Sequence, residues 1–287
     1  MSLIPKNLSR GLKILITLKK ITLDFNIQMT KKALKSAKIL NIPVSSTSID
    51  EVLDVVYSSL KSVSKFFITT PNPEIVVMAQ SDTGLLEALQ KADISVPDGI
   101  GLLWAAKYLG IKEPLVRIRG RELMVQLVEF AHDQKKKIFL LGSSNEVVKA
   151  CSLKLKKEYP RLKFEADSGW RLDRDAYPTD KSQKILEKKA IEKINKFKPD
   201  ILFVAFGAPK QEKWVSNHFK ELNIGGAMVV GGSLDYYSGV AKLPPSWMAS
   251  IGIEWLWRLI QDPKRFTRIW NAIFIFPLLV AKSRFKS

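Results

Sequence analysis

Side chains that can do chemistry directly follow two short apolar runs of the sequence. Thr70 and Asn72 come after the run 66–69, and Asp98 comes after the run 94–96. Each run is typical of a parallel β-strand that ends in a turn and feeds a helix. Ligands of open α/β sheets bind at the carboxyl ends of the strands. These three side chains are therefore expected to converge on one crevice.

The same residues also have a structural interpretation. Asn72 and Asp98 each precede a predicted helix, where a short polar side chain caps backbone N–H groups. If Asp98 is functional, its carboxylate can accept the proton of a hydroxyl nucleophile, which is the work of a general base. The sequence leaves both interpretations open.

Four arginines fit the other half of such a reaction. A diphosphate leaving group needs no acid, but it needs cations and N–H donors that stabilise its growing negative charge. Arg117 lies in a loop of the chain's middle, and Arg258, Arg265 and Arg268 lie among tryptophans near the C-terminus. The alternative for each arginine is a solvated surface charge or a contact with lipid phosphate.

Several other kinds of site find little support. The two histidines, His132 and His218, lie in helical patterns away from any motif, so a Ser-His-Asp triad or a histidine metal site is not expected. The glycine fingerprint of dinucleotide-binding folds and the P-loop are both absent. Asp173 and Asp175 have a spacing that some transferases use for a divalent metal, but they lie in a charged segment, 171–183, that resembles a surface insertion. We predict no metal and no cofactor.

Apolar runs and helical patterns alternate through the middle of the chain, which is typical of an α/β fold with a parallel sheet. Ser48-Ile-Asp-Glu51 has the spacing of a helix-capping box. The predicted strands are 39–44, 66–69, 94–96, 137–141, 163–166, 201–205 and 227–230. The predicted helices are 48–64, 73–92 (more than one), 100–109, 122–132, 145–159 and 185–197, with only helices after 242.

The net charge of +18 is concentrated in the two tails. Residues 1–38 carry nine Lys/Arg against one acidic residue, and residues 241–287 carry eight against two. We therefore divide the chain into a basic extension (1–38), a core (39–240) and a basic, aromatic, helical appendage (241–287).

Basic residues mixed with Trp, Phe and Leu are typical of a helix that lies on an anionic membrane surface. The apolar series 269–281 is shorter than the roughly 20 residues that a membrane crossing needs. We expect a peripheral protein that lies on a membrane and does not cross it. A nucleic-acid partner is not expected, because no nucleic-acid-binding motif is present.

Eight motifs, in order along the chain, resemble the WecG/TagA/CpsF glycosyltransferase family. They are Thr70-Pro-Asn-Pro73, Pro97-Asp-Gly-Ile-Gly101, Arg117-Ile-Arg-Gly-Arg-Glu-Leu123, Phe139-Leu-Leu-Gly142, Lys198-Pro-Asp200, Gly207-Ala-Pro-Lys-Gln-Glu212, Val230-Gly-Gly-Ser-Leu-Asp235 and Gly252-Ile-Glu-Trp-Leu-Trp-Arg-Leu259. The resemblance runs from about residue 42 to residue 284.

The resemblance implies a Rossmann-like core with a C-terminal helical, membrane-associating appendage, which acts at the cytoplasmic face of the membrane. It implies an inverting, metal-independent transfer of a sugar from a UDP-sugar to a sugar on a polyprenyl-diphosphate lipid. In many members the transferred sugar is N-acetylmannosamine. The product belongs to the synthesis of a cell-surface polysaccharide or teichoic acid. Asp98 matches the proposed base. Thr70, Asn72 and Gln211 match residues proposed to line the sugar site. The appendage arginines, Arg258, Arg265 and Arg268, are expected to close over the site, and the core is expected to form homo-oligomers when the appendage is removed.

The sequence departs from the family pattern at Arg119, Arg121 and Glu122, in the segment 171–183 and in the basic extension. These departures leave the donor sugar and the acceptor open. The alternatives are a UDP-glucose or UDP-mannosaminuronate transferase of the same family, and a non-catalytic binder of membranes or nucleic acid. A nicotinamide-dependent oxidoreductase is disfavoured because the glycine fingerprint is absent.

Overall fold

The computed structural model describes residues 34–245, 247–248 and 252–285. Residues Lys35–Ser287 form one compact unit. Most of the predicted basic extension therefore lies outside the described residues, although strand β1 (Ser36–Ile39) begins within its last residues. The division into extension, core and appendage stays a prediction.

The segment predicted as one strand, 39–44, is an antiparallel hairpin, so that prediction was wrong. Strand β1 pairs with β2 (Ile42–Ser45) through a two-residue turn at Leu40 and Asn41. Both turn residues have positive φ, 49° and 67°, which is the conformation of the turns that join tight hairpins. Asn tolerates this backbone better than most residues, but Leu does not, so the turn carried little signal in the sequence.

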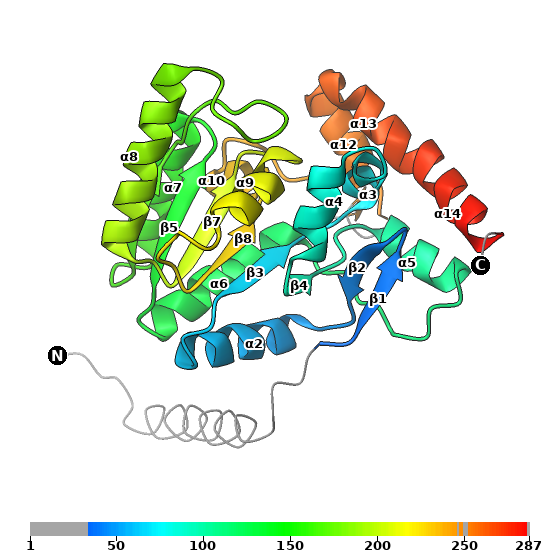
Figure 1. Cartoon of the computed structure of the whole chain (residues 1–287), viewed down its shortest axis with the longest axis horizontal. Helices are drawn as coiled ribbons and strands as arrows, with labels where there is room; N and C mark the ends of the chain where they lie inside the picture. The colour runs from blue at the N-terminus through cyan, green and yellow to red at the C-terminus, as the bar shows by residue number, and fades with distance from the viewer. Residues whose placement is uncertain (1–33, 246, 249–251, 286–287) are drawn as a thin grey trace. The chain divides into compact units, whose positions relative to one another are not determined.

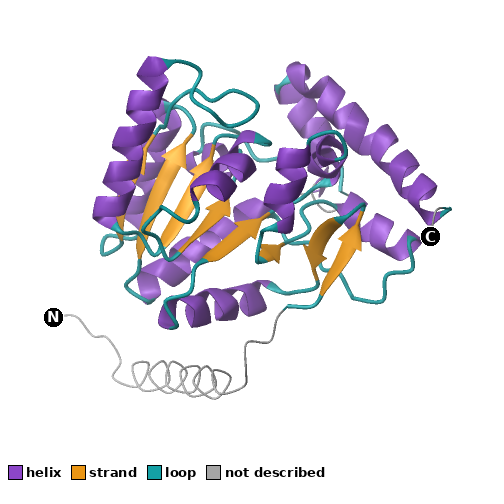
Figure 2. Cartoon of the chain, in the orientation of Figure 1, coloured by secondary structure: helices purple, strands orange, loops and turns teal. Residues whose placement is uncertain are grey.

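Six parallel strands form the main sheet, as predicted for the α/β fold (Figures 1 and 2). They are β3 (Phe66–Thr69), β4 (Ile94–Ser95), β5 (Lys137–Gly142), β6 (Lys163–Asp167), β7 (Ile201–Ala205) and β8 (Gly226–Val229), in the spatial order β4-β3-β8-β7-β5-β6. After β3 the chain forms β4 at one side of the sheet, and after β5 it forms β6 at the other side. The last two strands, β7 and β8, occupy the centre. Ligands of such sheets bind beyond the carboxyl ends of the strands, near the point where the strand order reverses.

Helices cover both faces of this sheet. They are α2 (Ile49–Lys61), α3 (Pro73–Ala79), α4 (Thr83–Gln90), α5 (Ile100–Tyr108), α6 (Gly120–Asp133), α7 (Asn145–Glu158), α8 (Lys181–Phe197), α9 (Lys210–His218) and α10 (Ser233–Ser238). The predicted capping box is present, since Ser48 Oγ accepts from Glu51 N and the Glu51 carboxylate accepts from Ser48 N.

Two apolar clusters hold these elements together. One joins β3, β5, β7 and β8 to α8 and α9 around the fully buried Trp214. The other joins the β1–β2 hairpin to α3, α4 and α5. Because side chains alternate across a strand, the intervening residues of the central strands, such as Leu140 and Phe203, are buried on the opposite face.

The C-terminal region is helical, as predicted. It contains α12 (Glu254–Gln261), a 3₁₀ turn (Pro263–Arg265), α13 (Phe266–Trp270), a π-helical turn (Asn271–Ile275) and α14 (Phe276–Arg284). Phe276 and Val280 are buried in the cluster that also contains the hairpin, so α14 is packed on the core beside α3 (Figure 1). Among the described residues, no helix combines the length and the apolar run that a membrane crossing needs.

Candidate active site

Thr70 and Asp98 lie together at the carboxyl edge of β3 and β4. The backbone N–H of Asp98 donates to the carbonyl of Pro71 (2.9 Å), which joins the two strand-end turns. Oδ2 of Asp98 accepts from the backbone N–H of Gly120 (3.3 Å). A Cβ atom on Gly120 would lie 3.2 Å from Thr70 Cγ2 and 3.5 Å from Asp98 Oδ2, so the three residues meet at one point. The predicted convergence of Thr70 and Asp98 is present, while their roles stay predictions.

Of the two residues that could cap a helix, Asn72 does so and Asp98 does not. Asn72 caps α3, because its Oδ1 accepts from the backbone N–H of Ile75 (2.9 Å). Asp98 does not cap α5. The residue before α5 is Gly99, with a φ of 107°, and no described side chain caps that helix. The carboxylate of Asp98 is directed instead to Gly120, at the start of α6.

Gln211 links the loops that follow β7 and β8. Its Oε1 accepts from the backbone N–H groups of Gly207 (3.1 Å) and Gly231 (3.0 Å). Its Nε2 donates to Oε1 of Glu212 (2.9 Å). Gln211 is 3% exposed, so these bonds fix the orientation of its amide. The structure places this residue at the same edge of the sheet as Asp98, and its role at a sugar site stays a prediction.

Glu212, the last residue of the motif that begins at Gly207, is a buried acid for which the sequence indicated no role. It is 1% exposed, and its Oε2 has no hydrogen-bond partner among the described residues. Burial raises the pKa of Glu212 to about 7, an effect that its hydrogen bond from Gln211 only partly offsets. The carboxyl of Glu212 is therefore protonated over much of the pH range in which exposed carboxyls are ionised.

Three arginines that precede or begin α6 meet one carboxylate from the C-terminal region. Glu254, the first residue of α12, pairs with Arg117 Nη2 (2.6 Å), Arg119 Nε (2.8 Å) and Arg121 Nη1 (2.7 Å). Burial alone would raise the pKa of Glu254, but the hydrogen bonds and charges of these arginines outweigh it and lower the pKa. Arg119 also pairs with Glu122 (2.7 Å). We call these three arginines and Glu254 the arginine cluster.

Two of the three predicted arginines of the appendage, Arg265 and Arg268, lie at the same edge of the sheet. Arg268 Nη1 lies 3.3 Å from Oε1 of Glu74, two residues after Asn72. Arg265 Nε lies 3.2 Å from Oδ2 of Asp262. The side chain of Arg258 lies outside the part of the structure that is described.

A cavity of about 270 Å³ opens directly after β8. It is lined by residues 232, 235, 236 and 240 of the core and by 241, 261, 262 and 265 of the appendage. Asp235 supplies a carboxylate there, and burial raises its pKa, while a hydrogen bond from Ser143 and the charge of Arg265 act in the opposite direction. The Arg121 guanidinium lies 5.8 Å from the centre of the Tyr236 ring, so the cavity adjoins the arginine cluster.

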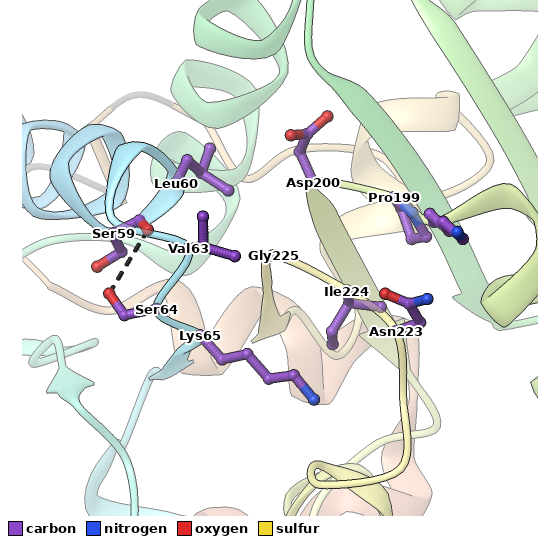
Figure 3. A pocket seen from close by; sticks show the side chains of 11 residues that line it. Ser59, Leu60, Val63, Ser64, Lys65, Pro199, Asp200, Asn223, Ile224 and Gly225 are labelled. Carbon is purple, nitrogen blue, oxygen red and sulfur yellow. Dashed lines mark hydrogen bonds between the residues drawn. The ribbon is translucent and has the colours of Figure 1, made fainter.

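A second cavity, of about 200 Å³, lies at the opposite edge of the sheet (Figure 3). Gly225 and Lys65 of its lining directly precede β8 and β3. The ammonium group of Lys65 donates to the carbonyls of residues 219, 220 and 222. This cavity is remote from Asp98, and its polar groups serve the packing of loops.

The acidic pair considered for a metal has structural contacts. Asp175 pairs with Lys213 Nζ (2.9 Å), which also pairs with Asp82 (2.8 Å). Oδ1 of Asp173 accepts from the backbone N–H groups of Asp175 and Tyr177. Within the described ranges, no group of three or more His, Cys, Asp or Glu side chains could hold a metal ion. Asp175 therefore anchors the segment 171–183 to α9, and Asp173 stabilises a turn within the segment.

Comparison with known proteins agrees with the resemblance. The profile of the glycosyl transferase WecG/TagA/CpsF family matches residues 37–287. Two similar relatives, from Staphylococcus aureus strains MW2 and NCTC 8325, are each described as an N-acetylglucosaminyldiphosphoundecaprenol N-acetyl-beta-D-mannosaminyltransferase. Each is 34% identical over 251 residues, which cover 86% of this chain and 93% of the relative. The chain belongs to the WecG/TagA/CpsF family of glycosyltransferases.

Proposed function

We propose that this glycosyltransferase moves N-acetylmannosamine from UDP-N-acetylmannosamine to N-acetylglucosamine carried on a polyprenyl diphosphate, in the synthesis of a cell-wall polysaccharide of the teichoic acid type. The relatives' descriptions support the sugar and the acceptor. The observation that carries the proposal is the position of Asp98 beside Thr70 at the carboxyl edge, with the arginine cluster next to it.

Asp98 acts as the general base. It accepts the proton of the acceptor hydroxyl as the oxygen of that hydroxyl attacks the anomeric carbon of the donor sugar. The new carbon–oxygen bond forms as the bond to the diphosphate breaks, and UDP leaves from the opposite face with the electron pair of that bond. A single displacement of this kind inverts the configuration at the anomeric carbon. The N–H of Gly120 orients the Asp98 carboxylate for this step.

Arginines stabilise the departing diphosphate. Arg265 and Arg268 lie on the appendage side of the edge, Arg117 lies on the core side, and Arg258 belongs to the helix between them. Removing a single hydrogen-bond donor to a developing anion typically costs on the order of 10²–10³-fold in kcat. No metal is needed in this mechanism, because the guanidinium groups supply the positive charge.

The donor nucleotide occupies the cavity after β8. Its volume of about 270 Å³ is close to the lower end of small-molecule sites. The carboxylate of Asp235 suits ribose hydroxyls, and Arg265 at the same cavity suits the diphosphate. The sugar then lies toward Thr70, toward the amide nitrogen of Asn72, whose oxygen is used as a cap, and toward Gln211.

The appendage brings this site to a lipid-linked acceptor at the cytoplasmic face of the membrane. It exposes large apolar side chains, namely Trp247, Ile260, Phe266, Trp270, Phe274, Leu278 and Phe285. Lys264, Arg268 and Lys282 are interleaved with them in sequence. Apolar groups that enter the lipid interface, next to cations that meet anionic headgroups, favour peripheral binding.

The test is UDP release by the purified full-length chain, supplied with one UDP-sugar at a time and with or without polyprenyl-diphosphate-linked N-acetylglucosamine. We expect release from UDP-N-acetylmannosamine that requires the acceptor, and an inverted linkage in the product. Preference for UDP-glucose or UDP-mannosaminuronate would replace the donor and keep the reaction class. Failure with every UDP-sugar would contradict the proposal and favour the basic binding protein, whose binding falls steeply with salt.

A further inference from the structure

Glu254 joins the C-terminal region to the segment 117–121, whose backbone contacts Asp98. In the segment 117–121, the guanidinium groups of Arg117, Arg119 and Arg121 converge on the two carboxylate oxygens of Glu254, at 2.6 to 2.8 Å. Glu254 is 9% exposed, so little water screens these contacts. A carboxylate in this position is bound far more firmly than in a surface ion pair.

Ile118 and Gly120, which lie between these arginines, contact the turn that contains Pro97 and Asp98. The backbone N–H of Ile118 donates to the carbonyl of Pro97 (3.0 Å), and the N–H of Gly120 donates to Oδ2 of Asp98 (3.3 Å). One short segment therefore contacts Glu254 through its arginine side chains and the turn of Asp98 through its backbone N–H groups.

Among the side chains of α12 that the structure describes, Glu254 makes the main attachment of this helix to the core. Glu254 is the only buried residue among those of α12 whose side chains the structure describes. Trp257 and Gln261 donate to the carbonyl of Lys242, which belongs to the appendage itself. Gly252, just before the helix, lies close to Ile100. Helix α14 differs, because it buries Phe276 and Val280 in the core.

We propose that Glu254 is a positioning residue: by pairing with Arg117, Arg119 and Arg121 it holds α12 closed over the carboxyl edge and fixes the segment that orients Asp98. It acts through those arginines and Gly120, and it does not touch the reacting atoms. Closure places the helix of Arg258 and the following Arg265 beside the donor cavity. The catalytic part of this inference rests on the proposed function.

The chain offers a matched control. Glu122 also pairs with Arg119 (2.7 Å), but it belongs to α6 of the core and cannot attach the appendage. Glu254→Gln and Glu122→Gln therefore make the same chemical change on the same arginine, and only the first removes the tie to α12. Glu254→Asp keeps the charge on a shorter side chain and serves as the conservative variant.

The experiment combines hydrogen exchange with kinetics on the full-length chain. In Glu254→Gln we expect amide exchange in 254–261 to accelerate at least about tenfold, while exchange in 276–284 stays at the wild-type rate. With UDP-N-acetylmannosamine and the lipid-linked acceptor, we expect kcat to fall on the order of 100-fold, since small displacements of catalytic groups have effects of this size. The shape of the pH–rate profile stays the same because the base is unchanged. Glu254→Asp recovers part of kcat, and Glu122→Gln resembles the wild type in both measurements.

Unchanged exchange of α12 in Glu254→Gln would overturn the inference, and so would faster exchange with an unchanged kcat. Faster exchange in 276–284 and in the core strands as well would show that Glu254 supports the whole fold, and this too would overturn it. The exchange measurement needs no substrate. An inactive wild-type chain would therefore contradict the proposed function alone, and the exchange of α12 would still decide whether Glu254 holds that helix.

Discussion

The edge of the main sheet at which its strands begin and the carboxyl edge, at which they end, use charged residues differently. At the edge where β4 begins, Asp93 Oδ2 accepts from the N–H of Phe67 (2.8 Å). At the start of β5, Asp200 Oδ2 accepts from the N–H of Lys137 (2.7 Å). Both carboxylates satisfy backbone groups of a neighbouring strand or loop. At the carboxyl edge, Asp98 accepts from the N–H of Gly120, and Glu254 joins the C-terminal region to the segment 117–121.

This difference separates stability from function. Charges that satisfy nearby backbone groups lower the cost of burying those groups, and they require no group from elsewhere. The carboxyl edge gathers its cations from the segment 117–121 and from the C-terminal helices, and three of these arginines share the single carboxylate of Glu254. Guanidinium groups gathered in this way suit an anionic ligand. We therefore expect changes at one edge to affect unfolding and changes at the other to affect turnover.

The largest effect is expected from removing the appendage after Lys242. The carboxyl edge then loses Arg258, Arg265, Arg268 and Glu254 together, so transfer to the lipid-linked acceptor should fall by on the order of 10³-fold or more. Sedimentation with anionic vesicles should show that membrane binding is lost too. A truncated chain that is soluble, folded and equally active would show that the core edge is complete by itself. Size-exclusion chromatography of the same chain tests the predicted self-association of the core.

A smaller effect is expected when one group of the donor cavity is changed. Arg265→Gln should raise KM for the UDP-sugar and lower kcat/KM by on the order of 100-fold, because the diphosphate loses a charged donor. The exposed neighbour Lys264 provides the control, and Lys264→Gln should stay within a few-fold of wild type. Equal losses in both variants would assign the effect to general charge, and the specific role of Arg265 would be wrong.

The opposite edge should respond in stability instead. Asp200→Ala leaves the N–H of Lys137 without its carboxylate, which should lower the free energy of unfolding by about 1–3 kcal/mol. Chemical denaturation followed by circular dichroism measures this change. Asp133→Ala, at an exposed helix end, is the control and should be nearly neutral. Transfer activity per folded molecule should stay normal in both, and a large loss of activity in Asp200→Ala would break the comparison between the edges.

Glu212 gives the smallest and most pH-specific effect. Its carboxyl has an ordinary pKa of 4.5 in the unfolded chain and a pKa of about 7 in the folded protein. The folded state therefore binds the proton more tightly, and this contribution to stability is complete below about pH 4.5 and is lost as the pH rises to about 7. Glu212→Gln cannot ionise, so its melting temperature should fall less between pH 5 and pH 8 than that of wild type.

The control for that measurement is Glu87→Gln, which changes an exposed carboxyl and should keep the wild-type pH dependence. In Glu212→Gln the amide oxygen of the new side chain can still accept from Gln211 Nε2, so activity near pH 7 should change little. An unchanged pH dependence in Glu212→Gln would mean that the buried carboxyl is already ionised in the folded protein.

Much of the fold could be predicted because it depends on local patterns. Strand 66–69 and the capping box at Ser48 depend on residue type and on spacing within a few positions. The hairpin turn at Leu40 and Asn41 was missed because its backbone conformation is stabilised by the pairing of the flanking strands and not by its own residues. The positions of helices relative to one another also lie beyond local pattern.

The candidate site shows the same division. The meeting of Thr70 with Asp98 follows from the rule that parallel strands end at a common edge. The contacts of Glu254 join residues 133 to 137 positions apart. They depend on where α12 is placed, which no motif spacing encodes. Asp235 and Glu212 both lie in motifs of the family resemblance, but their chemical environments follow only from the cavity that Asp235 lines and from the burial of Glu212.

The most direct test of the account compares two aspartates that flank β4. Asp98→Asn and Asp93→Asn are each assayed for UDP release from UDP-N-acetylmannosamine with the lipid-linked acceptor, and each is followed by thermal unfolding. We predict that Asp98→Asn loses at least about 10³-fold in kcat with little change in stability, and that Asp93→Asn is less stable but active per folded molecule. Equal activity of Asp98→Asn and wild type would contradict the account, because the carboxyl edge would then lack its base.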